Sequence, residues 1–114
     1  MYNTYMDINE YQVKAHETSI TPKVGEMFVY PTLGLAGEAG EIANKIKKVF
    51  RDKGGVVTSE TKEELKKELG DVLWYVAELT TQLDLSLEEI ATLNIERLHS
   101  RKVRGVIRGG GDNR

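Results

Sequence analysis

Apolar residues recur every three or four positions along most of the chain, which is the spacing of amphipathic helices. Four helices are predicted in this way, over about 7–17, 32–52, 61–85 and 86–104. In the first of them we expect Ile8, Tyr11, Val13 and Ala15 to face inward. Strand signals are nearly absent, because no alternating run exceeds four residues.

Local signals set the expected ends of these helices. The segment from Lys23 to Pro31 is expected to be an irregular connection, and Lys53-Gly54-Gly55 to end the second helix. A capping box is expected at Thr61 with Glu64, and another at Ser86 with Glu89.

These elements predict an all-α fold that resembles a four-helix bundle. A length of 114 residues allows one domain, which we place at 1–104, followed by a Gly/Arg-rich tail at 105–114. A domain of this size buries limited surface, so we expect a homodimer or homotetramer to complete the bundle.

Charge and composition exclude several classes of protein. The chain has no cysteine, 39% hydrophobic residues and no apolar segment of signal-peptide length near its start, so we expect a cytoplasmic protein that does not enter a membrane. Residues 96–114 carry a charge of +4 (six basic, two acidic), and residues 1–95 carry −6 (ten basic, sixteen acidic). This asymmetry favours an anionic ligand or a subunit contact over general nucleic-acid binding, although a solubilising tail is an open alternative.

Four carboxylates carry the chemistry that the sequence suggests. On a helical wheel at about 100° per residue, Glu38 and Glu41 flank the apolar stripe of the second helix. Glu68 and Asp71 flank the stripe of the third helix in the same way. If these stripes pack together, four negative charges converge, and a hard divalent cation such as Mg²⁺ or Mn²⁺ would relieve their repulsion. The alternative is that the acids form a solvated helix face.

Glycines accompany both acid pairs, since Glu38-Ala-Gly-Glu41 and Glu68-Leu-Gly-Asp71 share the order acid, apolar, Gly, acid. Each glycine inside a helix costs about 1 kcal/mol relative to Ala. We expect close helix packing or close ligand approach to compensate at Gly37, Gly40 and Gly70.

The segment Gly34-Leu-Ala-Gly-Glu-Ala-Gly-Glu41, followed after 26 residues by Glu68-Leu-Gly-Asp-Val-Leu-Trp-Tyr75, resembles the signature of the MazG-like all-α nucleoside triphosphate pyrophosphohydrolases. This resemblance implies Mg²⁺-dependent hydrolysis between the α and β phosphates, which yields a nucleoside monophosphate and pyrophosphate. It implies that Glu38, Glu41, Glu68 and Asp71 are the metal ligands, and that one of them also orients or deprotonates the attacking water.

The same resemblance implies that Asn94, Arg97 and Arg101 of the fourth helix approach the nucleotide. Lys45 and Lys48 are candidate phosphate contacts, although Lys45 could instead pair with Glu41 at i,i+4. A phosphoribosyl-ATP pyrophosphohydrolase is a related alternative, and a helical interaction module without enzymatic activity is a rival from another class.

Two aromatic residues follow the second acid pair. The wheel places Tyr75 beside Glu68, where it could touch a base, and it places Trp74 where packing against another subunit is expected. For both residues ordinary packing is the simpler alternative.

Overall fold

The structure is a computed structural model that describes residues 5–20, 22 and 25–105. It contains the helices α1 (Ile8–Glu17), α2 (Val29–Asp52), α3 (Ser59–Gln82) and α4 (Leu87–Arg104). In this part of the chain every regular element is a helix, so the prediction of an all-α fold is confirmed.

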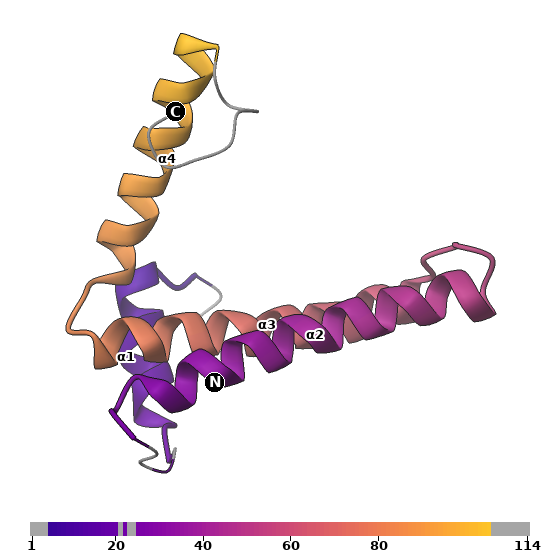
Figure 1. Cartoon of the computed structure of the whole chain (residues 1–114), viewed down its shortest axis with the longest axis horizontal. Helices are drawn as coiled ribbons and strands as arrows, with labels where there is room; N and C mark the ends of the chain where they lie inside the picture. Colours follow the sequence, from indigo (N-terminus) through magenta and orange to yellow (C-terminus); the bar gives the residue numbers. More distant parts are fainter. Residues whose placement is uncertain (1–4, 21, 23–24, 106–114) are drawn as a thin grey trace.

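The helices α2 and α3 form a long antiparallel hairpin, which lies horizontally in Figure 1. Its turn contains Gly54 and Gly55, whose φ angles of 61° and 81° belong to the left-handed region that glycine tolerates. On each of the two helices, one series of buried and half-buried residues recurs at alternating spacings of three and four, and we call these residues the seam, as in a coiled coil. They are Pro31, Leu35, Glu38, Ile42, Lys45 and Val49 on α2, and Thr61, Leu65, Glu68, Val72, Tyr75 and Leu79 on α3.

Helix α1 packs on α3 near the open end of the hairpin. The buried residues there are Ala15, Ala77 and Leu87, with Trp74 packed against them. The Trp74 indole Nε1 donates to the carbonyl oxygen of Ala15 at 3.1 Å and to Thr18 Oγ1 at 2.8 Å. Packing within the chain, the simpler alternative for Trp74, is therefore observed, and a contact of this half-buried residue with another subunit stays a prediction.

Helix α4 leaves this junction at a steep angle to the hairpin, as Figure 1 shows. It contacts α1 and α3 and, within the described residues, not α2. Ser86 caps its start by accepting from the Glu89 N–H at 3.2 Å, as predicted. Its end is at Arg104, where Gly105 takes a left-handed φ of 74°. The tail at 106–114 lies outside the described residues.

Three predicted boundaries are wrong. Helix α2 begins at Val29 rather than near Thr32, because Pro31 fits the first turn of a helix, where no N–H is required. Helix α3 begins at Ser59, because Thr58, and not Thr61, is its cap. The Thr58 hydroxyl accepts from the Thr61 N–H at 3.2 Å, and Thr61 itself is buried. Helix α3 also ends earlier than expected, at Gln82 rather than near Leu85.

The inward face of α1 is only partly as predicted. Ala15 is buried, and Ile8 and Tyr11 are half-buried, but Val13 is 60% exposed. The face that packs on α3 follows Ile8, Tyr11 and Ala15 at helical spacing, and Val13 lies off this face.

Candidate metal centre

Three of the four predicted carboxylates converge across the α2–α3 seam. One oxygen each from Glu38, Glu68 and Asp71 lies within 4.8 Å of the others. Glu38 and Glu68 are half-buried in the seam itself, whereas Asp71 and Glu41 are exposed. Glu41 is outside this group of three. The acids were expected to flank the packed stripe, and the correction is that one acid from each helix is part of the contact.

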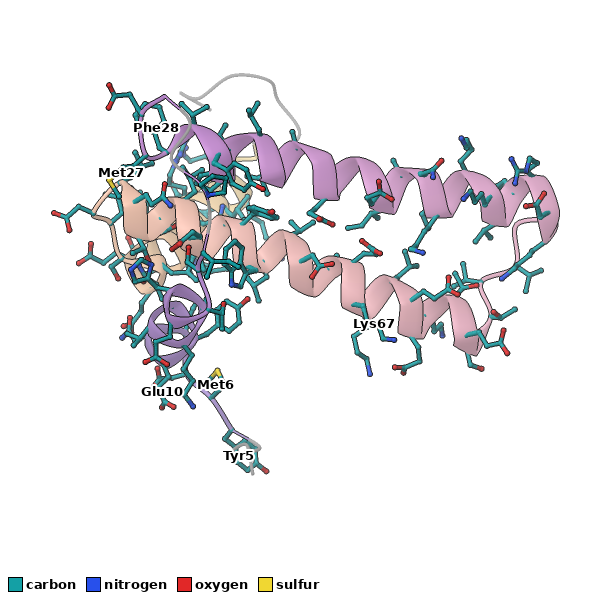
Figure 2. All side chains as sticks on the ribbon, turned by 90° about the horizontal axis from the view of Figure 1, so that it is seen from below. Tyr5, Met6, Glu10, Met27, Phe28 and Lys67 are labelled. Atoms are coloured by element: carbon teal, nitrogen blue, oxygen red, sulfur yellow. The ribbon has the colours of Figure 1, made fainter. Side chains whose placement is uncertain are left out.

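The three carboxylates, which we call the acid group, repel one another. The pKa of Glu38 is raised from its ordinary value, first by desolvation and then by the negative charges of Asp71, Glu68 and Glu41. Lys67, the sequence neighbour of Glu68, points away from α2 in Figure 2. Clustered carboxylate oxygens are ligands that a hard divalent cation prefers, so the donor set fits such a cation.

Aromatic side chains and the end of α1 line the space beside the acid group. A cavity of about 350 Å³ is bounded by Thr18, Glu38, Asp71, Trp74 and Tyr75. The rings of Trp74 and Tyr75 meet edge to face, with centroids 5.0 Å apart and planes at 88°. The lining of this cavity therefore combines the carboxylates of Glu38 and Asp71 with the rings of Trp74 and Tyr75, which we call the aromatic wall.

Two tyrosines near these acids have raised pKa values. The pKa of Tyr75 is raised by desolvation and then by Tyr30, Glu38 and Asp71. The pKa of Tyr11 is raised by desolvation and then by the charge of Asp71. Tyr75 was predicted to lie beside Glu68, whereas Tyr11 and Thr18 were not predicted at the site, because only the docking of α1 on α3 brings these two residues there.

The glycines near the acids have different surroundings. A Cβ atom at Gly34 would lie 2.2 Å from Tyr75 Cε1, so glycine at this position allows the close approach of α2 to α3. No such contact accounts for Gly37, Gly40 or Gly70, since a Cβ atom at each would meet nothing within 4 Å in the described structure. Close packing inside the chain is therefore not the reason for these three glycines.

Lys45 and Lys48 lie beyond the acid group, towards the turn of the hairpin. At 1.5 Å per residue, Lys45 is about 10 Å and Lys48 about 15 Å from Glu38 along α2. The Lys45 Nζ pairs with a Glu64 carboxylate oxygen at 3.8 Å, and not with Glu41. Both lysines line a separate cavity with Lys53.

The three predicted residues of α4 lie on a helix that does not contact α2 in the described chain. Asn94 and Arg97 are exposed, whereas Arg101 is only 9% exposed and is held within its own chain. The structure therefore does not bring Asn94, Arg97 and Arg101 to the acid group of the same chain.

A buried carboxylate at the α1–α3 contact was also missed. Glu78 is 1% exposed, and one of its carboxylate oxygens lies 2.7 Å from His16 Nδ1. Nothing in the sequence pattern distinguishes Glu78 from the exposed acids of α3, because its burial depends on α1. This pair helps to hold the end of α1 beside the cavity.

The fold and this site define an all-helical protein in which three clustered carboxylates are suited to a divalent cation. The family model described as "MazG nucleotide pyrophosphohydrolase domain" matches residues 31–105, and the chain belongs to this family. This confirms the family resemblance seen in the sequence.

The chain is also similar to the Gene 37 protein of Mycobacterium phage L5. The two are 53% identical over 114 residues, which cover 96% of this chain and all of the phage protein. No solved structure shows a significant match. In the described part of the chain, no helix is both long and apolar enough to span a membrane.

Proposed function

We propose that this chain hydrolyses a nucleoside or deoxynucleoside triphosphate between the α and β phosphates, with Mg²⁺ as its cofactor and Mn²⁺ as a substitute. The observation that carries this proposal is the acid group of Glu38, Glu68 and Asp71 in a chain of the MazG family. A bound cation would neutralise charge on the phosphate oxygens and lower the pKa of a bound water.

We assign cation binding, orientation of the attacking water and nucleoside binding to separate residues of the chain. Glu38, Glu68 and Asp71 hold the cation, and Glu41, exposed and one helical turn from Glu38, completes the ligand set or orients the attacking water. Its place outside the group of three supports the second role. The aromatic wall of Trp74 and Tyr75 then receives the nucleoside, because a base stacks on or against such rings. Lys45 has the shorter reach to the phosphates, and Lys48 lies farther along α2.

We propose further that the active protein is a homodimer or a homotetramer. One face of the hairpin exposes Ala39, Ala43 and Phe50 of α2 together with Leu69 and Leu73 of α3. On the helical wheels these residues lie on the face opposite to Glu41 and Asp71, so a second copy can cover them without covering the acids. The Cα radius of gyration of 17.0 Å, against about 13 Å for a compact chain of this length, supports such an association.

A second copy also gives α4 a role. Because α4 does not contact α2 of its own chain, we propose that Asn94, Arg97 and Arg101 act on a nucleotide held by another copy. Arg97 is the strongest of the three candidates, since the residue is exposed and a guanidinium suits phosphate oxygens.

Pyrophosphate release from a panel of canonical and modified nucleoside triphosphates tests the main proposal. With Mg²⁺ present, we expect release by the wild type and a loss of about 10²–10³ in rate for Glu41→Gln and for Asp71→Asn. Glu63→Gln is the matched control, because Glu63 is an exposed acid of α3 that pairs with Lys66 one turn along the same helix. Absence of release from every nucleotide would reject the hydrolase in favour of an interaction module.

Mixing two inactive variants tests the role of α4. If Arg97 serves another copy, Asp71→Asn and Arg97→Ala should complement each other after mixing. A random dimer then regains about a quarter of the wild-type rate, because half of the dimers keep one of two intact sites. No recovery, with mixed dimers demonstrated by differential tagging, would place Arg97 at its own site or at none.

A further inference from the structure

We propose that the cavity at the turn end of the hairpin is a second anion site, which binds an inorganic oligophosphate such as pyrophosphate without a metal. The cavity has a volume of about 250 Å³, and Lys45, Lys48 and Lys53 contribute three ammonium groups to its lining. This inference does not depend on the hydrolase activity, since it concerns another part of the hairpin.

The acids in this lining already have partners. Both carboxylate oxygens of Asp52 accept from the Arg51 guanidinium, at 2.7 and 2.8 Å. The pKa of Asp52 is lowered by this hydrogen bonding and by the charges of Arg51, Lys48 and Lys53. Glu64, which is largely exposed, is 3.8 Å from Lys45, longer than a hydrogen bond. With Arg51 beside Asp52, four basic groups (Lys45, Lys48, Arg51 and Lys53) stand against two acids (Asp52 and Glu64), which leaves a net charge of +2.

The base of the cavity is fixed by buried groups. Val49 is 3% exposed and Thr61 is 2% exposed, and the Thr61 hydroxyl accepts from Lys53 Nζ at 3.2 Å. Thr61 is in the first turn of α3, where the helix dipole favours an anion. Lys53 is thus held against an ordered hydroxyl rather than extended freely into solvent.

Size and distance set the class of ligand. Ordinary ligand pockets have volumes of about 300–1,000 Å³, so a cavity of about 250 Å³ suits a compact ligand. Along α2 the acid group is about 10 Å from Lys45 and about 15 Å from Lys48, so the phosphates of a nucleotide held there extend to Lys45 at most and do not fill the cavity. The net positive charge that remains around this small space favours a compact polyanion such as an oligophosphate.

Calorimetric titration of the full chain with inorganic pyrophosphate in EDTA and 150 mM salt tests this inference. Chelation removes divalent cations, so the acid group cannot hold the anion. We expect binding by the wild type, and a dissociation constant at least tenfold higher for Lys48→Ala and for Lys53→Ala. Inorganic phosphate, with one phosphorus centre, should bind more weakly than pyrophosphate.

Lys47→Ala is the matched control, because Lys47 is an exposed neighbour on α2 that does not line the cavity. We expect this variant to bind pyrophosphate within about twofold of the wild type, since it loses the same charge but no lining group. Unfolding curves would confirm that each variant folds. No binding by the wild type, or an equal loss for Lys47→Ala, would overturn the proposal and leave the lysines as compensation for the C-terminal dipole of α2.

Discussion

The two halves of the α2–α3 hairpin have the same helical seam and opposite chemistry. In the half near α1 the seam contains Glu38 and Glu68, and in the half near the turn it contains Lys45 and Thr61. In the first half three carboxylates meet one another, whereas in the second half Lys45 and Lys53 have oxygen partners in Glu64 and Thr61. The same packing pattern thus gathers carboxylates in one half of the hairpin and lysines in the other.

The largest expected difference between the two halves is in how substitutions there change the stabilisation of the fold by Mg²⁺. If the acid group binds the ion, a concentration of 100 times the dissociation constant stabilises the fold by about 2.7 kcal/mol. We expect this gain in thermal unfolding of the wild type and of Lys48→Ala, and its loss in Glu68→Gln. A gain that persists in Glu68→Gln would place the ion elsewhere.

Two glycines one helical turn apart sharpen the comparison within the acid half. Gly34→Ala places a methyl group 2.2 Å from Tyr75 Cε1, and such overpacking costs about 1–3 kcal/mol in the free energy of unfolding. Gly37→Ala meets nothing within 4 Å, so helix propensity should stabilise this variant by up to about 1 kcal/mol. Chemical denaturation measures both. Equal effects of the two substitutions would contradict the close contact between Gly34 and Tyr75.

The smallest of the expected effects is the change with pH in the stability of the metal-free protein. The pKa of Glu38 is raised in the folded chain, so between its ordinary value of 4.5 and the raised value the folded state binds more protons than the unfolded state. The contribution of Glu38 to stability should therefore increase as pH falls from 7 towards 4.5. In EDTA, Glu38→Gln should show a weaker dependence than the wild type, and identical profiles would refute the repulsion at Glu38.

Much of this organisation was predictable because it is periodic. Apolar spacing identified the four helices, and the matched wheel positions of Glu38 and Glu68 predicted that acids from two helices converge. Glu38 and Glu68 were nevertheless placed at the edge of the packed stripe rather than inside it. The apolar arc is wider than one helix contact, and sequence alone does not show which part of it the neighbouring helix covers.

Contacts between distant segments were not predictable in the same way. Thr58 and Thr61 are both suitable caps, and the choice between them depends on the burial of Thr61 against α2. Lys45 had a plausible partner at i,i+4 in Glu41, but the packed α3 supplies Glu64 instead. Tyr11 and Thr18 reach the acid group only because α1 docks on α3.

The hydrogen bonds of Trp74 provide the protein with an intrinsic optical probe. The chain contains one tryptophan, and its indole N–H is shared between Thr18 and Ala15 at the edge of the acidic cavity. All indole emission of the protein therefore originates beside the candidate metal centre. Binding of a cation or a nucleotide there should change the intensity or wavelength of that emission, so occupancy of this cavity can be followed in solution without an added label.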